Sequence, residues 1–381
     1  MQIKNARVFK ETGEFVEQVI NIAGGRFTDE SASGEVLDAS GLYAVPGLVD
    51  IHFHGCVGYD FCDGTPEAVQ KIAAYELSEG ITTIVPATMS FSEDILTGIM
   101  KNAADFAASQ ASSSAQYARL MGINMEGPFI SIEKKGAQNA AYIIPPDTGM
   151  FRRLQDVSGG LIKLCDIAPE TDGALDFIRE LKDEVAISLA HTTADYDTAA
   201  EAFSEGAAHV THLFNAMPPM NHRAPGVVGA AMDACASRDD VHVELICDGI
   251  HIHPAMVRAA FRMFGDDNIC LISDSMMATG LADGEYSLGG QSVHVVGNRA
   301  QLCDGTIAGS ATNLMNCVRT AVRKMGIPLG SAVKCASVNP AKAVGIFEEV
   351  GSIAPGKHAD LLLIDDELNI HAIIKDGIPA I

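Results

Sequence analysis

The feature that most constrains the fold is a repeated alternation, along the middle of the chain, of short apolar runs with segments of helical composition. Strands buried on both faces of a parallel sheet read as such runs, because helices cover them on either side. Eight runs favour an α/β fold with a closed (β/α)8 barrel. An open doubly wound sheet is the alternative, but no GxGxxG motif follows the first run. The eight runs are GLVDIHFH (47–54), ITTIVPAT (81–88), ARLMGINMEG (118–127), LIKLCDIAPE (161–170), VAISLAHT (185–192), AHVTHLF (208–214), VELICDG (243–249) and NICLISDS (268–275).

The two ends of the chain have a different pattern. Before Pro46 the sequence alternates in short strand-like pieces separated by turns that contain glycine, and residues 351–378 read in the same way. We therefore expect both termini to meet in one small β-sandwich domain, formed by residues 1–48 and 345–381. The barrel would comprise residues 49–344.

Composition narrows the class of function. The 26 basic and 49 acidic side chains give a formal net charge of -23, which disfavours binding to nucleic acid or to anionic lipid. The N-terminus lacks the apolar core of a signal peptide, and there is no uncharged apolar run of about 18 residues that would span a bilayer. The nine cysteines are scattered without CxxC pairs, so we expect reduced core residues, with metal binding by Cys56 or Cys62 as the alternative. A cytoplasmic location is the default expectation.

Histidines and carboxylates stand where the predicted strands end. In a (β/α)8 barrel the carboxyl ends of the strands meet at one rim, where active sites form. His52 and His54 leave the first strand on the same face, because alternate residues of a strand point the same way. Four further candidates at other strand ends would converge with this pair: Glu126, His191, His212 and Asp274.

Several imidazoles with carboxylates and no thiolate match the donor set of a catalytic divalent-metal site. A bound metal lowers the pKa of water, and Asp274 can take the proton of that water and pass it to a leaving group. Each residue also has a purely structural interpretation: a histidine can be an ordinary polar residue, Glu126 can cap a helix and Asp274 can lie in a turn. That interpretation must hold independently at five or six strand ends, so the sequence favours the metal site.

The HxH pair, the single histidines and the aspartate resemble the amidohydrolase superfamily of metal-dependent hydrolases. Further segments, in order and nearly end to end, are similar to those of its family of N-acetylglucosamine-6-phosphate deacetylases. The tails YAVPGLVDIHFHG and GSIAPGKHADLLLID resemble the junctions between barrel and β-domain in such enzymes. The segments are NMEGPF (124–129), AHTTAD (190–195), THLFNAM (211–217), RAPGVVGA (223–230), CDGIHIHP (247–254), SDSMMATG (273–280) and DGTIAGS (304–310).

The resemblance implies a hydrolase that removes acetate from the 2-acetamido group of N-acetylglucosamine-6-phosphate, a small sugar phosphate, to give glucosamine-6-phosphate. It implies that Glu126, His191 and His212 bind the principal metal, and that Asp274 is the general base and acid. The metal would be Zn, Fe, Mn or Co, since imidazole and carboxylate suit all four.

The resemblance also implies a homodimer and a set of substrate-binding residues. Arg223 and His251 would hold the phosphate, with Arg223 reaching in from the partner subunit. The guanidinium fork of arginine matches phosphate oxygens, and Arg223 stands beside a histidine in an otherwise acidic chain. The turn 307–309 would line the acetyl end. The full substrate-binding set is Ala137, Gln138, Asn215, Ala216, His222, Arg223, Asp248, His251, Ile307, Ala308 and Gly309.

Two positions depart from the pattern of the family. Some members carry glutamine in place of the first histidine and use one metal, whereas this chain keeps both His52 and His54. A second metal, bridged to the first by Glu126, is therefore chemically plausible, and the number of metals stays open at one or two. The family often reads KKGAH after the Glu126 motif, with a histidine that polarises the substrate carbonyl. Here the sequence is KKGAQ, and Gln138 can donate a hydrogen bond but cannot carry charge.

Three alternative functions stay open at this point. A dihydroorotase or hydantoinase would share the metal-site residues, but those relatives resemble one another in a bridging lysine on the fourth strand, where this chain offers only Lys163 inside an apolar run. A deacetylase of the galactosamine isomer would differ in the orientation of one hydroxyl. A sugar-phosphate-binding protein that kept the fold and lost the chemistry is the third, although Asp274 and every candidate ligand are present.

Overall fold

The computed structural model describes residues 1–110 and 116–380. Its centre is a curled arrangement of short parallel strands in two hydrogen-bonded sheets, with the orders β10-β9-β6 and β11-β12-β13-β14-β15-β16. An isolated parallel bridge between Ala87 and Asn124 connects the two sheets. The strands are β6 (Leu48–Asp50), β9 (Ile81–Ile84), β10 (Arg119–Leu120), β11 (Ile123–Met125), β12 (Ile162–Ile167), β13 (Ala186–Leu189), β14 (His209–Val210), β15 (His242–Ile246) and β16 (Ile269–Ile272).

Every predicted apolar run contains a strand, but the predicted strand ends were wrong. For example, β6 ends at Asp50, before both His52 and His54, and β16 ends at Ile272, two residues before Asp274. The run from residue 118 to 127 is interrupted and forms β10 and β11. The sheet ladder stops early because the following residues turn away from it: Asp274 has a φ of 49°, which a strand cannot contain.

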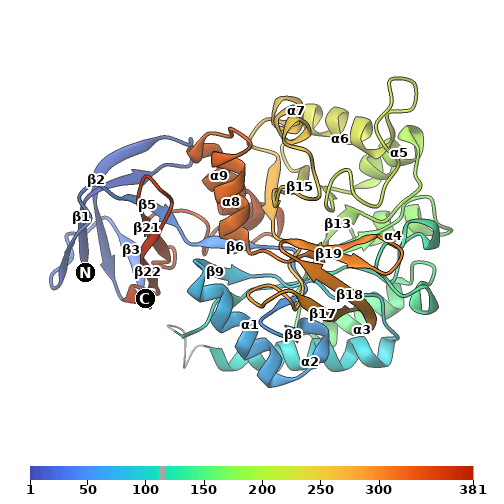
Figure 1. The fold of residues 1–381 in the computed structure, drawn as a ribbon, viewed down its shortest axis with the longest axis horizontal. Coiled ribbons are helices and arrows are strands. Elements are labelled where there is room, and N and C mark those ends of the chain that lie inside the picture. Colours follow the sequence, from blue (N-terminus) through green and yellow to red (C-terminus); the bar gives the residue numbers. More distant parts are fainter. Residues whose placement is uncertain (111–115, 381) are drawn as a thin grey trace.

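Helices alternate with these strands and cover the outside of the curled sheet (Figure 1). The first of them begins with a proline after Thr65, whose side chain accepts a hydrogen bond from the amide of Ala68, as expected for a capped helix. The largest apolar core joins strand residues such as Ile187 and Val243 to helix residues such as Phe177. The helices are α1 (Pro66–Ser78), α2 (Glu93–Ser109), α3 (Thr148–Val157), α4 (Ala174–Leu181), α5 (Tyr196–Glu205), α6 (Gly226–Ser237), α7 (Pro254–Phe264), α8 (Leu314–Arg323), α9 (Leu329–Ala336) and α10 (Val338–Ala343), with short 3-10 turns at Phe61–Asp63, Ile132–Lys134 and Ala140–Tyr142.

Strands from both ends of the chain share one eight-stranded sheet, which lies at one end of the molecule with both termini (Figure 1). Its order is β23-β22-β21-β5-β1-β2-β3, with β4 paired to β1. This sheet has an apolar cluster of its own, which includes Ile3, Ile20 and Leu361. The strands are β1 (Gln2–Phe9), β2 (Phe15–Ala23), β3 (Arg26–Thr28), β4 (Val36–Asp38), β5 (Tyr43–Pro46), β21 (Leu361–Ile364), β22 (Ile370–Lys375) and β23 (Ile378–Pro379).

The sequence analysis did not anticipate a four-stranded antiparallel sheet between β16 and α8, nor a two-stranded hairpin after β6. A parallel bridge joins Ser275, in the segment that follows β16, to Ser310 at the end of the four-stranded sheet. The strands are β7 (Gly55–Cys56), β8 (Tyr59–Asp60), β17 (Gly284–Leu288), β18 (Gln291–Val296), β19 (Arg299–Leu302) and β20 (Ile307–Ser310).

All nine cysteines are free, and most are buried. Among the helices of residues 1–110 and 116–380, none combines the length and the apolar character that crossing a membrane requires.

Candidate metal centre and active site

The predicted metal ligands and the predicted catalytic aspartate lie together just beyond the carboxyl ends of five parallel strands. All six side chains are buried. His191, His212 and Asp274 have positive φ angles of 43°, 31° and 49°, a region that residues other than glycine rarely adopt. Such conformations cost about 1–3 kcal/mol each and cluster at functional sites. The six residues are His52 and His54 after β6, Glu126 after β11, His191 after β13, His212 after β14 and Asp274 after β16.

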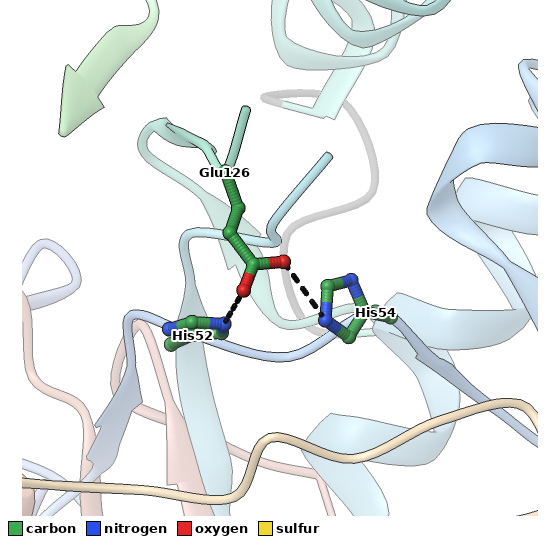
Figure 2. Close-up of side chains that lie close together, drawn as sticks. All are labelled: His52, His54 and Glu126. Carbon is green, nitrogen blue, oxygen red and sulfur yellow. Dashed lines mark ion pairs between the residues drawn. The ribbon is translucent and has the colours of Figure 1, made fainter. Parts of the chain in front are cut away.

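The carboxylate of Glu126 lies at the centre of this group. Figure 2 shows it between the rings of His52 and His54, whose Nε2 atoms lie 3.6 Å from Oε1 and 3.4 Å from Oε2, respectively. Oε1 also lies 3.0 Å from His191 Nε2 and 3.4 Å from His212 Nε2. One buried carboxylate therefore contacts four imidazoles that come from three different strands.

The ring nitrogens of this group fit a divalent metal. His191 Nδ1 lies 2.7 Å from the carbonyl oxygen of Lys134, which can only accept, so Nδ1 carries a proton. In the neutral ring Nε2 then presents a lone pair, and it faces both Glu126 Oε1 and, at 3.1 Å, His212 Nε2. Electron-rich atoms that face one another at these distances repel unless a cation lies among them. The set of nitrogen and oxygen donors is the one that catalytic divalent metals use.

A second group of ligands shares the same glutamate. Glu126, His191 and His212 form one set whose ligand atoms lie within 4.8 Å of one another, and Glu126, His52 and His54 form another. His52 Nε2 is buried and has no hydrogen-bond partner among the described residues. A buried nitrogen that faces a shared carboxylate and has no hydrogen-bond partner is the arrangement expected of a metal ligand.

The histidines keep both carboxylates of the site ionised. Burial opposes ionisation of Glu126, but the neighbouring imidazoles of His191, His212 and His52 outweigh it and hold its pKa well below the usual range. Burial likewise opposes ionisation of Asp274, but the imidazole of His54 and the other nearby histidines outweigh it and lower its pKa. Asp274 Oδ1 lies 3.4 Å from His54 Nε2, so an ionised carboxylate stands beside the candidate ligands.

A cavity of about 360 Å³ opens onto this group. It brings together His54, Glu126, His191, His212 and Asp274 with most of the predicted substrate residues. The predicted substrate residues that line it are Ala137, Gln138, Asn215, Ala216, His251, Ile307 and Gly309.

Gln138 lines the cavity and also contacts the shared metal ligand Glu126. Its Nε2 donates to Glu126 Oε2 at 2.8 Å, and its Oε1 accepts from the backbone amide of Ser90 at 2.6 Å. The side chain is almost fully buried. Both ends of the amide are therefore held by the protein, and its donor is directed at the candidate metal ligand.

Four predicted substrate residues do not line the cavity. Asp248 contacts His251 instead, with Oδ2 2.7 Å from His251 Nδ1, and so orients a ring that does line it. Ala308 is buried, because the alternation of β20 turns it away from the side on which its two neighbours lie. His222 and Arg223 lie in the exposed turn 221–224, outside the cavity.

Several residues of the site were not predicted from the sequence. Lys134, Gly136 and Thr306 stand inside motifs that were recognised, KKGAQ and DGTIAGS, so their positions were available. Buried Glu244 breaks the apolar run VELICDG, and an acidic residue in such a run was a usable signal. Met89, Glu133 and Leu288 also line the cavity, and no pattern in the sequence marks them.

Comparison with known proteins identifies the protein family to which this chain belongs. Residues 43–379 match the Amidohydrolase family, and the chain belongs to this family. It is 39% identical over 349 residues to the N-acetylglucosamine-6-phosphate deacetylase of Bacillus subtilis, covering 91% of this chain and 87% of that protein. It is 30% identical over 377 residues to the N-acetylgalactosamine-6-phosphate deacetylase of Escherichia coli O157:H7, covering 98% of each. The predicted family resemblance is thereby confirmed.

A solved structure agrees with these sequence matches. A mutant of N-acetyl-D-glucosamine-6-phosphate deacetylase from Mycobacterium smegmatis, in complex with N-acetyl-D-glucosamine-6-phosphate, superposes with a TM-score of 0.91 at 32% identity. The alignment covers 100% of this chain and 99% of that one.

Proposed function

We propose that this chain is a metal-dependent deacetylase that hydrolyses N-acetylglucosamine-6-phosphate to glucosamine-6-phosphate and acetate. The observation that carries the proposal is Glu126, an ionised carboxylate surrounded by four imidazoles in a cavity that Asp274 also lines. The similarity to named deacetylases over almost the whole chain supports the substrate class.

Two metals fit the donor atoms. Glu126, His191 and His212 would hold the principal ion, and Glu126 would share a second with His52 and His54. Zn, Fe, Mn and Co all suit these ligands. When bound, a divalent cation polarises a carbonyl and lowers the pKa of water towards 7.

Asp274 performs the proton transfers in this proposal. Its ionised carboxylate removes a proton from the water that attacks the acetamide carbonyl, and then returns that proton to the amine nitrogen as the C–N bond breaks. Donors near the carbonyl stabilise the tetrahedral oxyanion. Gln138 acts on Glu126 and leaves the substrate carbonyl to other groups, because its amide is already held at both ends.

The sugar phosphate would lie between the metal site and a basic group. His251, oriented by Asp248, would bind the phosphate with Arg223 of the partner subunit, and His222 stands beside that arginine. Arg223 is exposed and outside the cavity of its own chain, which supports a homodimer in which each subunit completes the other's site. Asn215 and Ala216 would contact the sugar, and the segment 307–309 would line the acetyl end.

The fold that carries this site is, in the same proposal, a closed (β/α)8 barrel of residues 49–344 beside a small β-sandwich domain of residues 1–48 and 345–381. The backbone amide of Asp274 donates to the carbonyl of His52 at 2.9 Å, a hydrogen bond between the segments that follow β16 and β6, which supports closure. A separate apolar cluster in the terminal sheet supports the second domain. A cytoplasmic location remains a proposal that rests on the free cysteines.

The deciding experiment is acetate release from N-acetylglucosamine-6-phosphate, from its galacto isomer and from unphosphorylated N-acetylglucosamine, each with and without added metal. We expect the phosphorylated gluco substrate to give the highest kcat/KM. Faster turnover of the galacto isomer would establish the alternative deacetylase, which the similarity to the Escherichia coli relative keeps as the second candidate. Binding of both sugar phosphates without release of acetate would show a non-catalytic homologue.

A further inference from the structure

A buried carboxylate next to the site contacts both candidate ligand groups. Glu244 lies in the middle of β15 and is fully buried. Its Oε2 lies 2.9 Å from His52 Nδ1 and accepts from the backbone amide of His212, also at 2.9 Å. Its Oε1 lies 3.1 Å from His209 Nε2. The side chain therefore touches one member of each ligand group without lining the cavity.

The contact with His52 decides which ring nitrogen faces the site. An ionised carboxylate can only accept, so the hydrogen bond places the proton of His52 on Nδ1. A metal-binding imidazole must offer an unprotonated nitrogen, and Nε2 is the atom left for this purpose. His52 Nε2 lies 3.6 Å from Glu126 Oε1 and 3.9 Å from Asp274 Oδ1.

We propose that Glu244 is a positioning residue that fixes the orientation and the tautomer of His52, and thereby creates the second metal subsite. The inference rests on the proposed metal centre and deepens it. Carboxylates that accept a hydrogen bond from a metal-binding histidine orient the ring and raise its basicity, and their loss costs about 10–100-fold in metal affinity. Because Oε2 also accepts from the amide of His212, the same atom holds the backbone of a ligand of the first subsite.

A simpler role for Glu244, as the counter-ion of buried His209, does not account for the contacts. The oxygen that faces His209 is Oε1, whereas both contacts with the ligand groups use Oε2. If Glu244 served only as the counter-ion of His209, replacing Glu244 with the isosteric glutamine would leave the affinity of the protein for the second metal unchanged. The two roles are therefore separable by metal binding.

The test compares wild type with Glu244→Gln and Glu244→Leu. Each protein is purified without chelator, equilibrated with excess Co²⁺ and dialysed. Bound metal is counted by mass spectrometry, and titration with Co²⁺, followed by its visible absorption, gives the affinity of each subsite. Glu76→Gln is the matched control, since Glu76 is equally buried, its carboxylate oxygens have no hydrogen-bond partner among the described residues, and it belongs to neither ligand group. Thermal unfolding confirms that each variant is folded.

We expect two equivalents in wild type and in Glu76→Gln. In Glu244→Gln the Kd of the second equivalent should rise about tenfold, because a neutral amide is a weaker acceptor for His52. In Glu244→Leu it should rise about 100-fold, so that dialysis leaves one equivalent. If Glu244→Leu does not fold, the Kd of the second equivalent in Glu244→Gln alone decides whether Glu244 positions His52.

Three outcomes would overturn a proposal, and they differ from one another. Unchanged affinity for two equivalents in the folded Glu244 variants would overturn the role of Glu244 and leave the deacetylase proposal intact. A single equivalent in wild type would also overturn it, because no second subsite would exist to position. Wild type that binds no metal would overturn the metal centre itself.

Discussion

Gln138 Nε2 donates to Glu126 Oε2 at 2.8 Å, so a residue that was predicted to bind the substrate also contacts the shared metal ligand. A hydrogen bond to a charged group contributes about 1.5–3 kcal/mol. We therefore expect Gln138→Ala to lower kcat/KM about tenfold or more and to weaken metal binding in parallel. Steady-state kinetics and metal analysis test this, with Gln155→Ala as a control because the side chain of that glutamine hydrogen-bonds to the backbone of Ile162 and to Ser158 and does not line the cavity. A fall in kcat with full metal affinity would return Gln138 to the substrate carbonyl.

Asp274→Asn should keep the metals and lose the chemistry. The amide has the shape of the carboxylate but cannot take a proton, and loss of a general base commonly costs about 10²–10⁴-fold in rate. The matched control is Asp166→Asn, since Asp166 is buried like Asp274, its Oδ1 accepts from Thr211 Oγ1, and it belongs to neither ligand group. Rates of acetate release and metal content are measured on both proteins. Turnover of Asp274→Asn near the wild-type rate would remove Asp274 from the mechanism.

Mixing two inactive variants tests whether Arg223 acts across a dimer interface. Arg223→Ala and Asp274→Asn should each be inactive as homodimers. In a mixed dimer one site combines the intact Asp274 of one subunit with the intact Arg223 of the other. Random exchange between equal amounts should restore about a quarter of wild-type activity, because half of the dimers carry one complete site in two. Activity that stays at the level of the separate variants would place Arg223 outside the partner's site.

Removal of metal should destabilise the folded chain. A ligand that binds only the folded state stabilises it by about 2.7 kcal/mol at 100 times its Kd, so a chelator should lower the Tm of wild type. Glu126→Gln should show no such shift, since Glu126 belongs to both ligand groups. Differential scanning calorimetry with and without chelator makes the comparison. A chelator-dependent Tm in Glu126→Gln equal to that of wild type would locate the metal elsewhere.

A buried ion pair in the terminal sheet provides a prediction about stability alone. Lys375 on β22 is 1% exposed, and its Nζ lies 3.0 Å from Asp360 Oδ2. Lys375→Ala leaves a buried carboxylate unpaired, so we expect a loss of about 3–5 kcal/mol in the free energy of unfolding. Arg153→Ala breaks an exposed pair with Glu93 and should cost far less, because solvent screens that pair. Denaturant unfolding of the two variants measures both values, and equal losses would contradict the argument.

The local and repetitive part of this protein could be predicted from the order of its residues. Short apolar runs between helical segments are set by which residues lie next to one another, and the six polar residues towards the ends of those runs were visible for the same reason. The strand ends could not be predicted from the sequence. Asp274, for example, ends the strand pairing by adopting a positive φ, and nothing in its residue type predicts that conformation.

Only the tertiary structure decided which atoms meet. Glu244 and His52 are 192 residues apart, and their contact depends on how β15 and β6 are placed around the curled sheet. The amide of Gln138 reaches Glu126 through a loop whose path no periodicity records. The exposed turn that carries Arg223 lies outside the cavity of its own chain, and no sequence pattern records that position either. Residue types and spacing thus indicated a metal site, whereas the partner of each nitrogen and oxygen followed from packing between distant segments.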